Sequence, residues 1–122
     1  HNGKEFDFPF IARRLLIQQM PIPYKLKLFG KKPWEIPHLD TLELWKFGDY
    51  KTYTSLKLLT HVLNVPSPKQ DIDGSQVREV YYQDQDVKRI AAYCEQDTIA
   101  VAQLLLRYRN EDLLNPSEII HI

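Results

Sequence analysis

A tyrosine and an aspartate late in the sequence, Tyr93 and Asp97, have a spacing that suits joint chemistry. Residues 86–108 contain neither Pro nor Gly and carry apolar residues at helical spacing, so they predict one long helix. Side chains at i and i+4 lie on one face of a helix. The Tyr93 hydroxyl and the Asp97 carboxylate are therefore expected to share a surface.

The position of Asp97 indicates that its carboxylate needs a partner. It lies near the middle of an apolar stripe, and Tyr93 borders that stripe. An ionised carboxylate on a core-facing surface is costly unless a cation or hydrogen-bond donors compensate it. The partner could be an Arg or Lys, or the face could turn to solvent. The alternative is a metal ion in a cavity that Tyr93 shares. The stripe is formed by Ile90, Cys94, Val101, Leu104 and Tyr108.

A second acid, Asp7, lies just before a helix expected over Pro9–Gln19, where Pro9 suits the first helical position. If Phe8 is the N-cap, Asp7 lies outside this helix. Two roles stay open for Asp7, which has aromatic residues on either side: it could cap the helix, or it could face a cleft.

Between the two acids the sequence predicts a strand over His38–Leu44, because apolar and polar residues alternate there. A second helix is predicted over Ser55–Leu63, with Thr54 or Ser55 as its cap. Residues 67–80 are expected to form a polar loop hinged at Gly74. We place the end of the domain at residue 110 and interpret residues 111–122 as a tail.

The composition fits one small globular domain of 122 residues, 43% hydrophobic and 26% charged. No apolar run is long enough for a membrane span and nothing resembles a signal peptide, so we expect a soluble, cytoplasmic protein without a membrane partner. The four histidines and the single cysteine follow no zinc-site spacing. A structural zinc site is therefore not expected.

The net charge is zero but unevenly distributed. Residues 1–36 carry seven bases against three acids, a balance of +4, and residues 71–97 carry seven acids against three bases, a balance of −4. These regions could hold a polyanion beside a cation site, or they could be two solvated faces. The basic and aromatic segment Tyr24–Trp34 could contact a single strand through phosphates and stacking, or form an amphipathic surface turn.

Two motifs make a resemblance to a known family specific. Residues Asn2-x-x-x-Phe6-Asp7-x-Pro9-Phe10 resemble the second exonuclease motif in the proofreading domains of family B DNA polymerases. Tyr93-x-x-x-Asp97 is similar to the third motif of the tyrosine-bearing branch of the DEDD 3′–5′ exonuclease superfamily. The motifs occur in the expected order, and the resemblance covers residues 1 to about 108. It suggests predicted bacterial exonucleases related to the polymerase domain.

This resemblance implies an α/β, ribonuclease H-like fold and removal of nucleotides from a 3′ end by two divalent ions, Mg²⁺ or Mn²⁺. Asp7 and Asp97 would be two of four metal-binding acids, and Tyr93 would orient the attacking water. Asn2 and Phe6 would contact the terminal nucleotide, by hydrogen bonding and by stacking. The expected partner is a single-stranded 3′ end, of DNA rather than RNA.

The sequence departs from the family pattern in one respect: it contains no D-x-E pair, which supplies the first two acids in the family. We therefore expect this chain to be a mostly helical C-terminal part of the domain, lacking the first strands and inactive alone. Its Ile90–Leu104 stripe would be partly uncovered and could support a homo-oligomer. The alternative is a non-catalytic nucleic-acid-binding or interaction module of the same fold.

Overall fold

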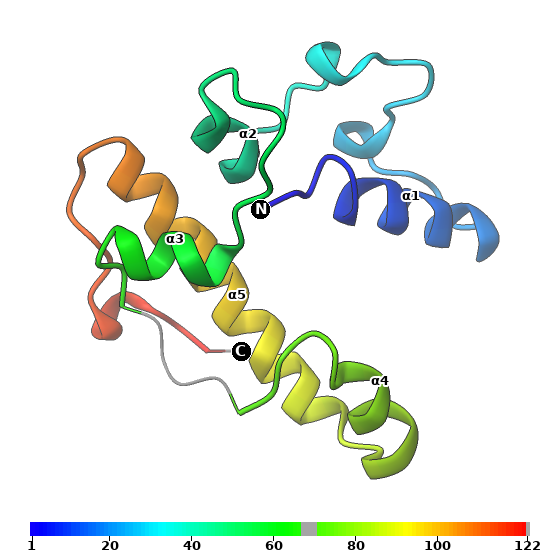
Figure 1. Cartoon of the computed structure of the whole chain (residues 1–122). Helices are drawn as coiled ribbons and strands as arrows, with labels where there is room; N and C mark the ends of the chain where they lie inside the picture. Colours follow the sequence, from blue (N-terminus) through cyan, green and yellow to red (C-terminus); the bar gives the residue numbers. More distant parts are fainter. Residues whose placement is uncertain (67–70, 122) are drawn as a thin grey trace. The chain divides into compact units, whose positions relative to one another are not determined.

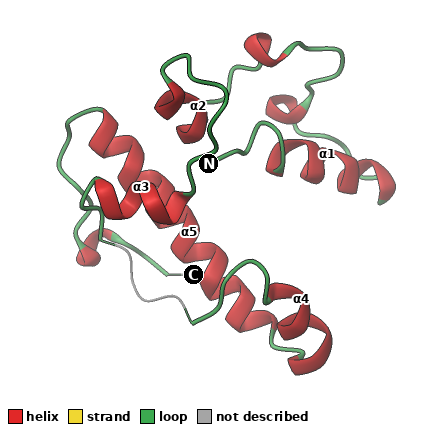
Figure 2. Cartoon of the chain, viewed as in Figure 1, coloured by secondary structure: helices red, strands yellow, loops and turns green. Residues whose placement is uncertain are grey.

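The computed structural model describes residues 1–66 and 71–121, and within these ranges the chain forms helices and turns but no strand (Figure 2). The chain divides into two compact units, His1–Tyr53 and Thr54 to the C-terminus. The mostly helical character predicted from the sequence is confirmed. None of the described helices is both long and apolar enough to cross a lipid bilayer.

The first unit begins with helix α1, Asp7–Ile17, drawn in blue in Figure 1. The backbone N–H groups of Phe6 and Phe8 donate to the carbonyls of Asn2 and Gly3, at 3.1 and 2.9 Å. The chain is therefore already wound before Pro9, and the N-cap is Phe6. The prediction that Asp7 lies outside this helix is wrong: Asp7 is its first residue.

Helix α2, Thr41–Lys46, replaces the strand predicted over His38–Leu44. Asp40 is its N-cap, and the Asp40 Oδ1 atom accepts a hydrogen bond from the Leu42 N–H at 2.9 Å. Such a bond satisfies a donor that a helix start leaves free, so it favours the helix over an extended chain. Short 3₁₀ turns at Tyr24–Leu26 and Pro33–Glu35 connect α1 to α2.

The second unit contains helices α3, Leu56–Val62, α4, Val77–Glu79, and α5, Val87–Tyr108 (Figure 1). Ser55 caps α3 by accepting from the Leu58 N–H at 3.2 Å, and Asp86 caps α5. Helices α3 and α5 confirm the prediction to within one residue at each end. A π-helical turn, Val80–Asp84, follows α4, and a 3₁₀ turn lies at Pro116–Glu118.

The core of the second unit forms where α3 packs on α5. Leu59 and Leu104 are fully enclosed there. The predicted stripe on α5 is only partly a core face, because Ile90, Asp97 and Val101 are half-buried and Cys94 is exposed. The stripe is therefore partly uncovered, as expected: Leu104 is enclosed, whereas Cys94 is exposed. The other buried apolar residues of this unit are Val65, Ile72, Val80 and Ala100.

The segments on either side of α5, predicted as a polar loop over residues 67–80 and a tail over residues 111–122, contain short helical elements where they are described. Residues 67–70 of the predicted polar loop lie outside the described residues, and the remainder includes α4. After α5, the Gln103 side-chain amide donates to the Leu114 carbonyl at 3.0 Å and accepts from the Leu114 N–H at 2.9 Å. The segment interpreted as a tail is thus attached to α5.

Candidate active site

The structure brings Tyr93 and Asp97 into contact, as their spacing predicts. Both side chains are half-buried on α5, and the Tyr93 hydroxyl is hydrogen-bonded to the Asp97 carboxylate. Burial, followed by this hydrogen bond and the negative charge of Asp97, raises the pKa of Tyr93 to about 12. Tyr93 therefore keeps its proton at neutral pH, and its hydroxyl donates a hydrogen bond to Asp97.

Gly74 lies beside the Tyr93 hydroxyl and belongs to a segment outside α5. A Cβ atom built on Gly74 would lie 3.5 Å from the Tyr93 hydroxyl oxygen, which is ordinary van der Waals contact. The loop that carries Gly74 thus passes directly beside the Tyr93 oxygen. The sequence predicts a hinge at Gly74, whereas in the structure a Cβ at this position would only touch the hydroxyl, so the contact does not require glycine.

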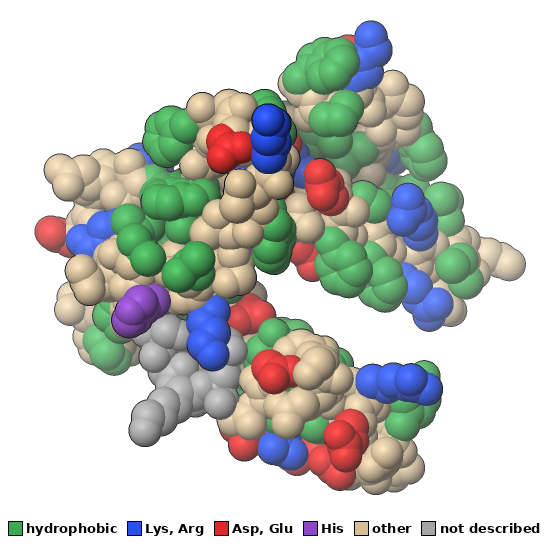
Figure 3. All heavy atoms as spheres, viewed as in Figure 1, with side chains coloured by type: hydrophobic (Ala, Val, Ile, Leu, Met, Phe, Trp, Pro, Cys, Tyr) green, Lys and Arg blue, Asp and Glu red, His purple; other side chains and the backbone are tan. Residues whose placement is uncertain are grey.

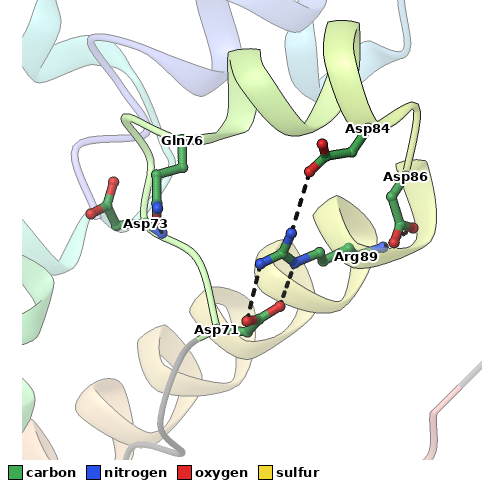
Figure 4. A network of polar contacts seen from close by, with 6 residues as sticks. All are labelled: Asp71, Asp73, Gln76, Asp84, Asp86 and Arg89. Atoms are coloured by element: carbon green, nitrogen blue, oxygen red, sulfur yellow. Dashed lines mark hydrogen bonds and ion pairs between the residues drawn. The ribbon is translucent and has the colours of Figure 1, made fainter.

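Arg89 attaches that loop to α5, as Figure 4 shows. Its guanidinium bonds both carboxylate oxygens of Asp71 from Nε and Nη2, the latter at 3.1 Å, and reaches Asp84 at 3.4 Å. The Arg89 backbone N–H also donates to Asp86 at 3.0 Å. Arg89 lowers the pKa of Asp71 through its side-chain hydrogen bonds. Three acids of the region with net charge −4, Asp71, Asp84 and Asp86, therefore lie around Arg89.

A second set of hydrogen bonds shapes the loop itself. The Asp73 carboxylate accepts from the Ser75 N–H at 2.8 Å and from the Ser75 hydroxyl, which lowers the pKa of Asp73. The Asp73 N–H in turn donates to the Gln76 side chain at 2.9 Å. These local bonds fix the turn in which Gly74 lies.

Asp7, Phe6 and Asn2 belong to the first unit. Asp7 is exposed in the first turn of α1, where a negative charge is favourable near the helix N-terminus. Phe6 is 65% exposed and stacks on Phe10 with ring centroids 6.0 Å apart. An exposed aromatic face of this kind can stack on a base. Since Phe6 is the N-cap and makes no side-chain cap bond, Asp7 does not fill the capping role considered for it.

Asp40 is an anchor of the N-terminal motif that sequence reasoning missed. It is only 4% exposed, and its carboxylate accepts from the backbone N–H groups of Asn2, at 2.8 Å, and Lys4, at 3.1 Å. Asn2 itself has φ 64°, a left-handed conformation that Asn tolerates better than most residues. Asp40 therefore holds the backbone of Asn2 in place.

The charge state of Asp40 follows from these hydrogen bonds. Burial alone would raise its pKa, but the hydrogen bonds from Lys4, Asn2 and Leu42 outweigh burial, so the pKa of Asp40 lies below its ordinary value of 3.8. The sequence does contain a signal for the other role of Asp40, as the cap of α2. Asp40 is followed three residues later by Glu43, a helix-start pattern that competes with the alternation read as a strand.

The donor types suit a hard divalent cation, but the described residues do not assemble a complete ligand set. Carboxylate oxygens are what Mg²⁺ and Mn²⁺ prefer. Yet no group of three or more His, Cys, Asp or Glu side chains placed to hold an ion occurs among the residues described. Asp7 belongs to the first unit and Asp97 to the second.

Comparison with known proteins identifies a family whose sequence model matches this chain. No curated protein and no solved structure matches the chain. The sequence model of one family matches residues 1–116, which include both motifs, and that family is described as predicted 3′–5′ exonucleases related to the exonuclease domain of PolB. The chain therefore belongs to this family of predicted 3′–5′ exonucleases.

Proposed function

We propose that the protein carrying this chain is a metal-dependent 3′–5′ exonuclease that removes nucleotides from a single-stranded 3′ end, of DNA rather than RNA. The observation that supports it best is the contact between Tyr93 and Asp97, inside the range that the family model matches. The finer fold assignment, an α/β ribonuclease H-like domain to which this chain contributes helices, is part of the same proposal.

Tyr93 would position the attacking water. Its hydroxyl donates a hydrogen bond to Asp97, and a tyrosine oxygen that donates in this way still has lone pairs with which it can accept a hydrogen bond. A water molecule that donates to this oxygen has its own lone pair free for the phosphorus atom. Since the pKa of Tyr93 is about 12, the residue acts through orientation and not as a base at neutral pH.

Asp97 and Asp7 would contribute to holding Mg²⁺ or Mn²⁺, with further acids needed to complete the set. Two such ions, when bound, stabilise the attacking and the leaving oxygen of a phosphodiester hydrolysis. In the first unit, Phe6 would stack on the terminal base through its exposed face, and Asn2, fixed by Asp40, would hydrogen-bond to the same nucleotide.

The test compares Asp97→Asn and Asp7→Asn in the full-length protein with a 5′-labelled single-stranded oligodeoxynucleotide and saturating Mg²⁺ or Mn²⁺. Each variant should nearly abolish nucleotide release, because an amide oxygen replaces a charged ligand. Asp112→Asn and Asp49→Asn, which change exposed acids outside the motifs, are matched controls and should keep the wild-type rate. A near wild-type rate for Asp97→Asn would refute the assignment.

The second candidate is a non-catalytic nucleic-acid-binding module of the same family. It is favoured by the lack of a three-ligand group among the described residues. The same experiment separates the two: a full-length protein that binds the oligodeoxynucleotide but releases no nucleotide with either metal is the module.

A further inference from the structure

The segment Tyr24–Trp34 turns its aromatic side chains outward and its aliphatic side chains inward. Tyr24, Phe29 and Trp34 are 89%, 70% and 77% exposed, whereas Leu26 and Leu28 are half-buried. Hydrophobic burial alone would not leave the largest apolar surfaces in water. We name this surface, formed by residues 24–34, the aromatic platform.

The platform is anchored to the rest of the first unit. His38 Nε2 is 2.7 Å from the Lys25 carbonyl oxygen, so a protonated Nε2 donates to it. The His38 ring packs against Phe8 of α1 with centroids 4.3 Å apart. At the other end, Glu35 accepts from the Lys32 N–H at 2.7 Å. The platform is thus attached to the unit through His38, and its other end is a turn capped by its own Glu35.

The charge of the platform is uncompensated. It contains four lysines and no acid, and no ion pair to these lysines occurs within residues 1–66 and 71–121. The Lys32 ammonium lies 5.2 Å from the ring centroid of Trp34, which places a positive charge beside an aromatic face. In Figure 3, a hydrophobic side chain lies beside a basic one at the top of the view, where Figure 1 draws the cyan turn of this segment. The four lysines are Lys25, Lys27, Lys31 and Lys32.

We propose that the aromatic platform binds single-stranded nucleic acid, with bases stacked on Phe29 and Trp34 and phosphates held by the lysines. Alternating bases and phosphates match this combination of flat rings and cations. A lipid surface fits it less well, because Leu26 and Leu28 are turned inward. The inference rests on the proposed function and adds to it: the platform would hold the strand outside the reacting 3′ end.

The test measures binding without cleavage, by fluorescence anisotropy of labelled oligothymidylate with the full-length protein in EDTA. Trp34→Ala and Phe29→Ala should each weaken binding at least about fivefold, because each removes one base stack. Phe47→Ala removes an exposed aromatic side chain of the same unit outside the platform, and should bind within about twofold of wild type. Unchanged thermal unfolding of the variants confirms that they fold.

The lysines have a separate signature in the salt dependence of binding. For single strands, the slope of log affinity against log salt concentration decreases in magnitude by about 0.7 for each phosphate that the protein no longer neutralises. Lys27→Gln and Lys31→Gln should each reduce the slope by about this amount, whereas Trp34→Ala should lower the affinity and leave the slope unchanged. Lys51→Gln, at an exposed site outside the platform, is the matched control.

Two results would overturn the inference. One is equal binding by Trp34→Ala, Phe29→Ala and Phe47→Ala. The other is weaker binding of these variants to phosphatidylserine vesicles but not to oligothymidylate, which would assign the platform to a membrane surface. Because metal and cleavage are absent from the assay, failure of the proposed hydrolysis would leave the binding result standing, and failure of the platform would leave the Asp97→Asn test intact.

Discussion

Tyr93 and Asp97 divide one task between them in the proposed reaction. Asp97 supplies charge for a metal ion, while Tyr93 supplies a fixed oxygen that is not charged at neutral pH. Tyr93→Phe should therefore lower the rate of nucleotide release by about 10²–10³-fold, the effect of removing one positioned catalytic group. Its affinity for Mn²⁺, measured by calorimetric titration of the full-length protein, should barely change.

Tyr82→Phe is the matched control for this experiment. Tyr82 is exposed in the π-helical turn and has no place in the motif, so its substitution should affect neither rate nor metal binding. Loss of Mn²⁺ binding by Tyr93→Phe, to the same degree as by Asp97→Asn, would show that the hydroxyl is a ligand and that the division of roles is wrong.

At the residue scale, sequence reasoning succeeded where the backbone geometry is fixed locally. A helix sets the distance between Tyr93 and Asp97, so their contact follows once the helix is recognised. Gly74 and Asp40 could not be found in this way. Gly74 reaches Tyr93 from another segment, and Asp40 binds Asn2 and Lys4 across more than thirty residues of sequence.

Among the elements, α2 shows how a single cap decides between helix and strand. The alternation over His38–Leu44 fits a strand, but an isolated strand has no partner for its backbone groups. Asp40 instead satisfies N–H groups of both the helix start and the N-terminal segment. The two capped helices, α3 and α5, were predictable because cap and periodicity agree there.

The caps make stability depend on the charge of Asp40. Since its folded pKa lies below 3.8, the stability that Asp40 contributes is complete above the unfolded pKa and is lost as pH falls through the folded pKa. Asp40→Asn should lower the free energy of unfolding by about 1–3 kcal/mol at neutral pH. Both oxygens of the native carboxylate accept from backbone N–H groups, and the amide nitrogen of Asn would face one set of these donors without being able to accept. Urea unfolding followed by tryptophan fluorescence measures this decrease.

Acidification should remove the difference. Below the folded pKa the wild-type side chain is protonated too, so the unfolding midpoints of wild type and Asp40→Asn should converge. Asp49→Asn, at an exposed acid of the same unit, serves as control and should follow wild type throughout. If the difference between the two unfolding midpoints stays constant down to the lowest pH measured, the charge of Asp40 is not what stabilises the fold.

For the whole molecule, the two units differ in how much apolar surface they enclose. Among the described residues, Leu42 is the buried apolar side chain of the first unit, whereas the second unit buries six. This division could not be predicted, because the sequence shows apolar residues on helices in both halves without showing which of them meet. The apolar residues of α1, for example, remain at least partly exposed.

This imbalance predicts two separate unfolding transitions. Both tryptophans, Trp34 and Trp45, lie in the first unit, while the 22-residue helix α5 dominates the helical signal of the second. Tryptophan fluorescence should therefore change at a lower urea concentration than far-ultraviolet circular dichroism. Coincident transitions would show that the units unfold together.

Truncation of one core residue in each unit provides the control. Leu104→Ala should lower the free energy of unfolding of the second unit by about 2–5 kcal/mol and should shift mainly the circular dichroism transition. Leu42→Ala should shift the fluorescence transition and leave the other nearly unchanged. Equal shifts of both signals by either variant would contradict the separation.

Cys94 gives this protein a built-in attachment point for a spectroscopic probe. It is the single cysteine of the chain, its side chain is exposed, and it lies between Tyr93 and Asp97 on α5. A nitroxide coupled to its thiol would require no engineered cysteine. Paramagnetic Mn²⁺ bound at Asp97 would then broaden the nitroxide spectrum, so metal occupancy can be followed in solution separately from turnover.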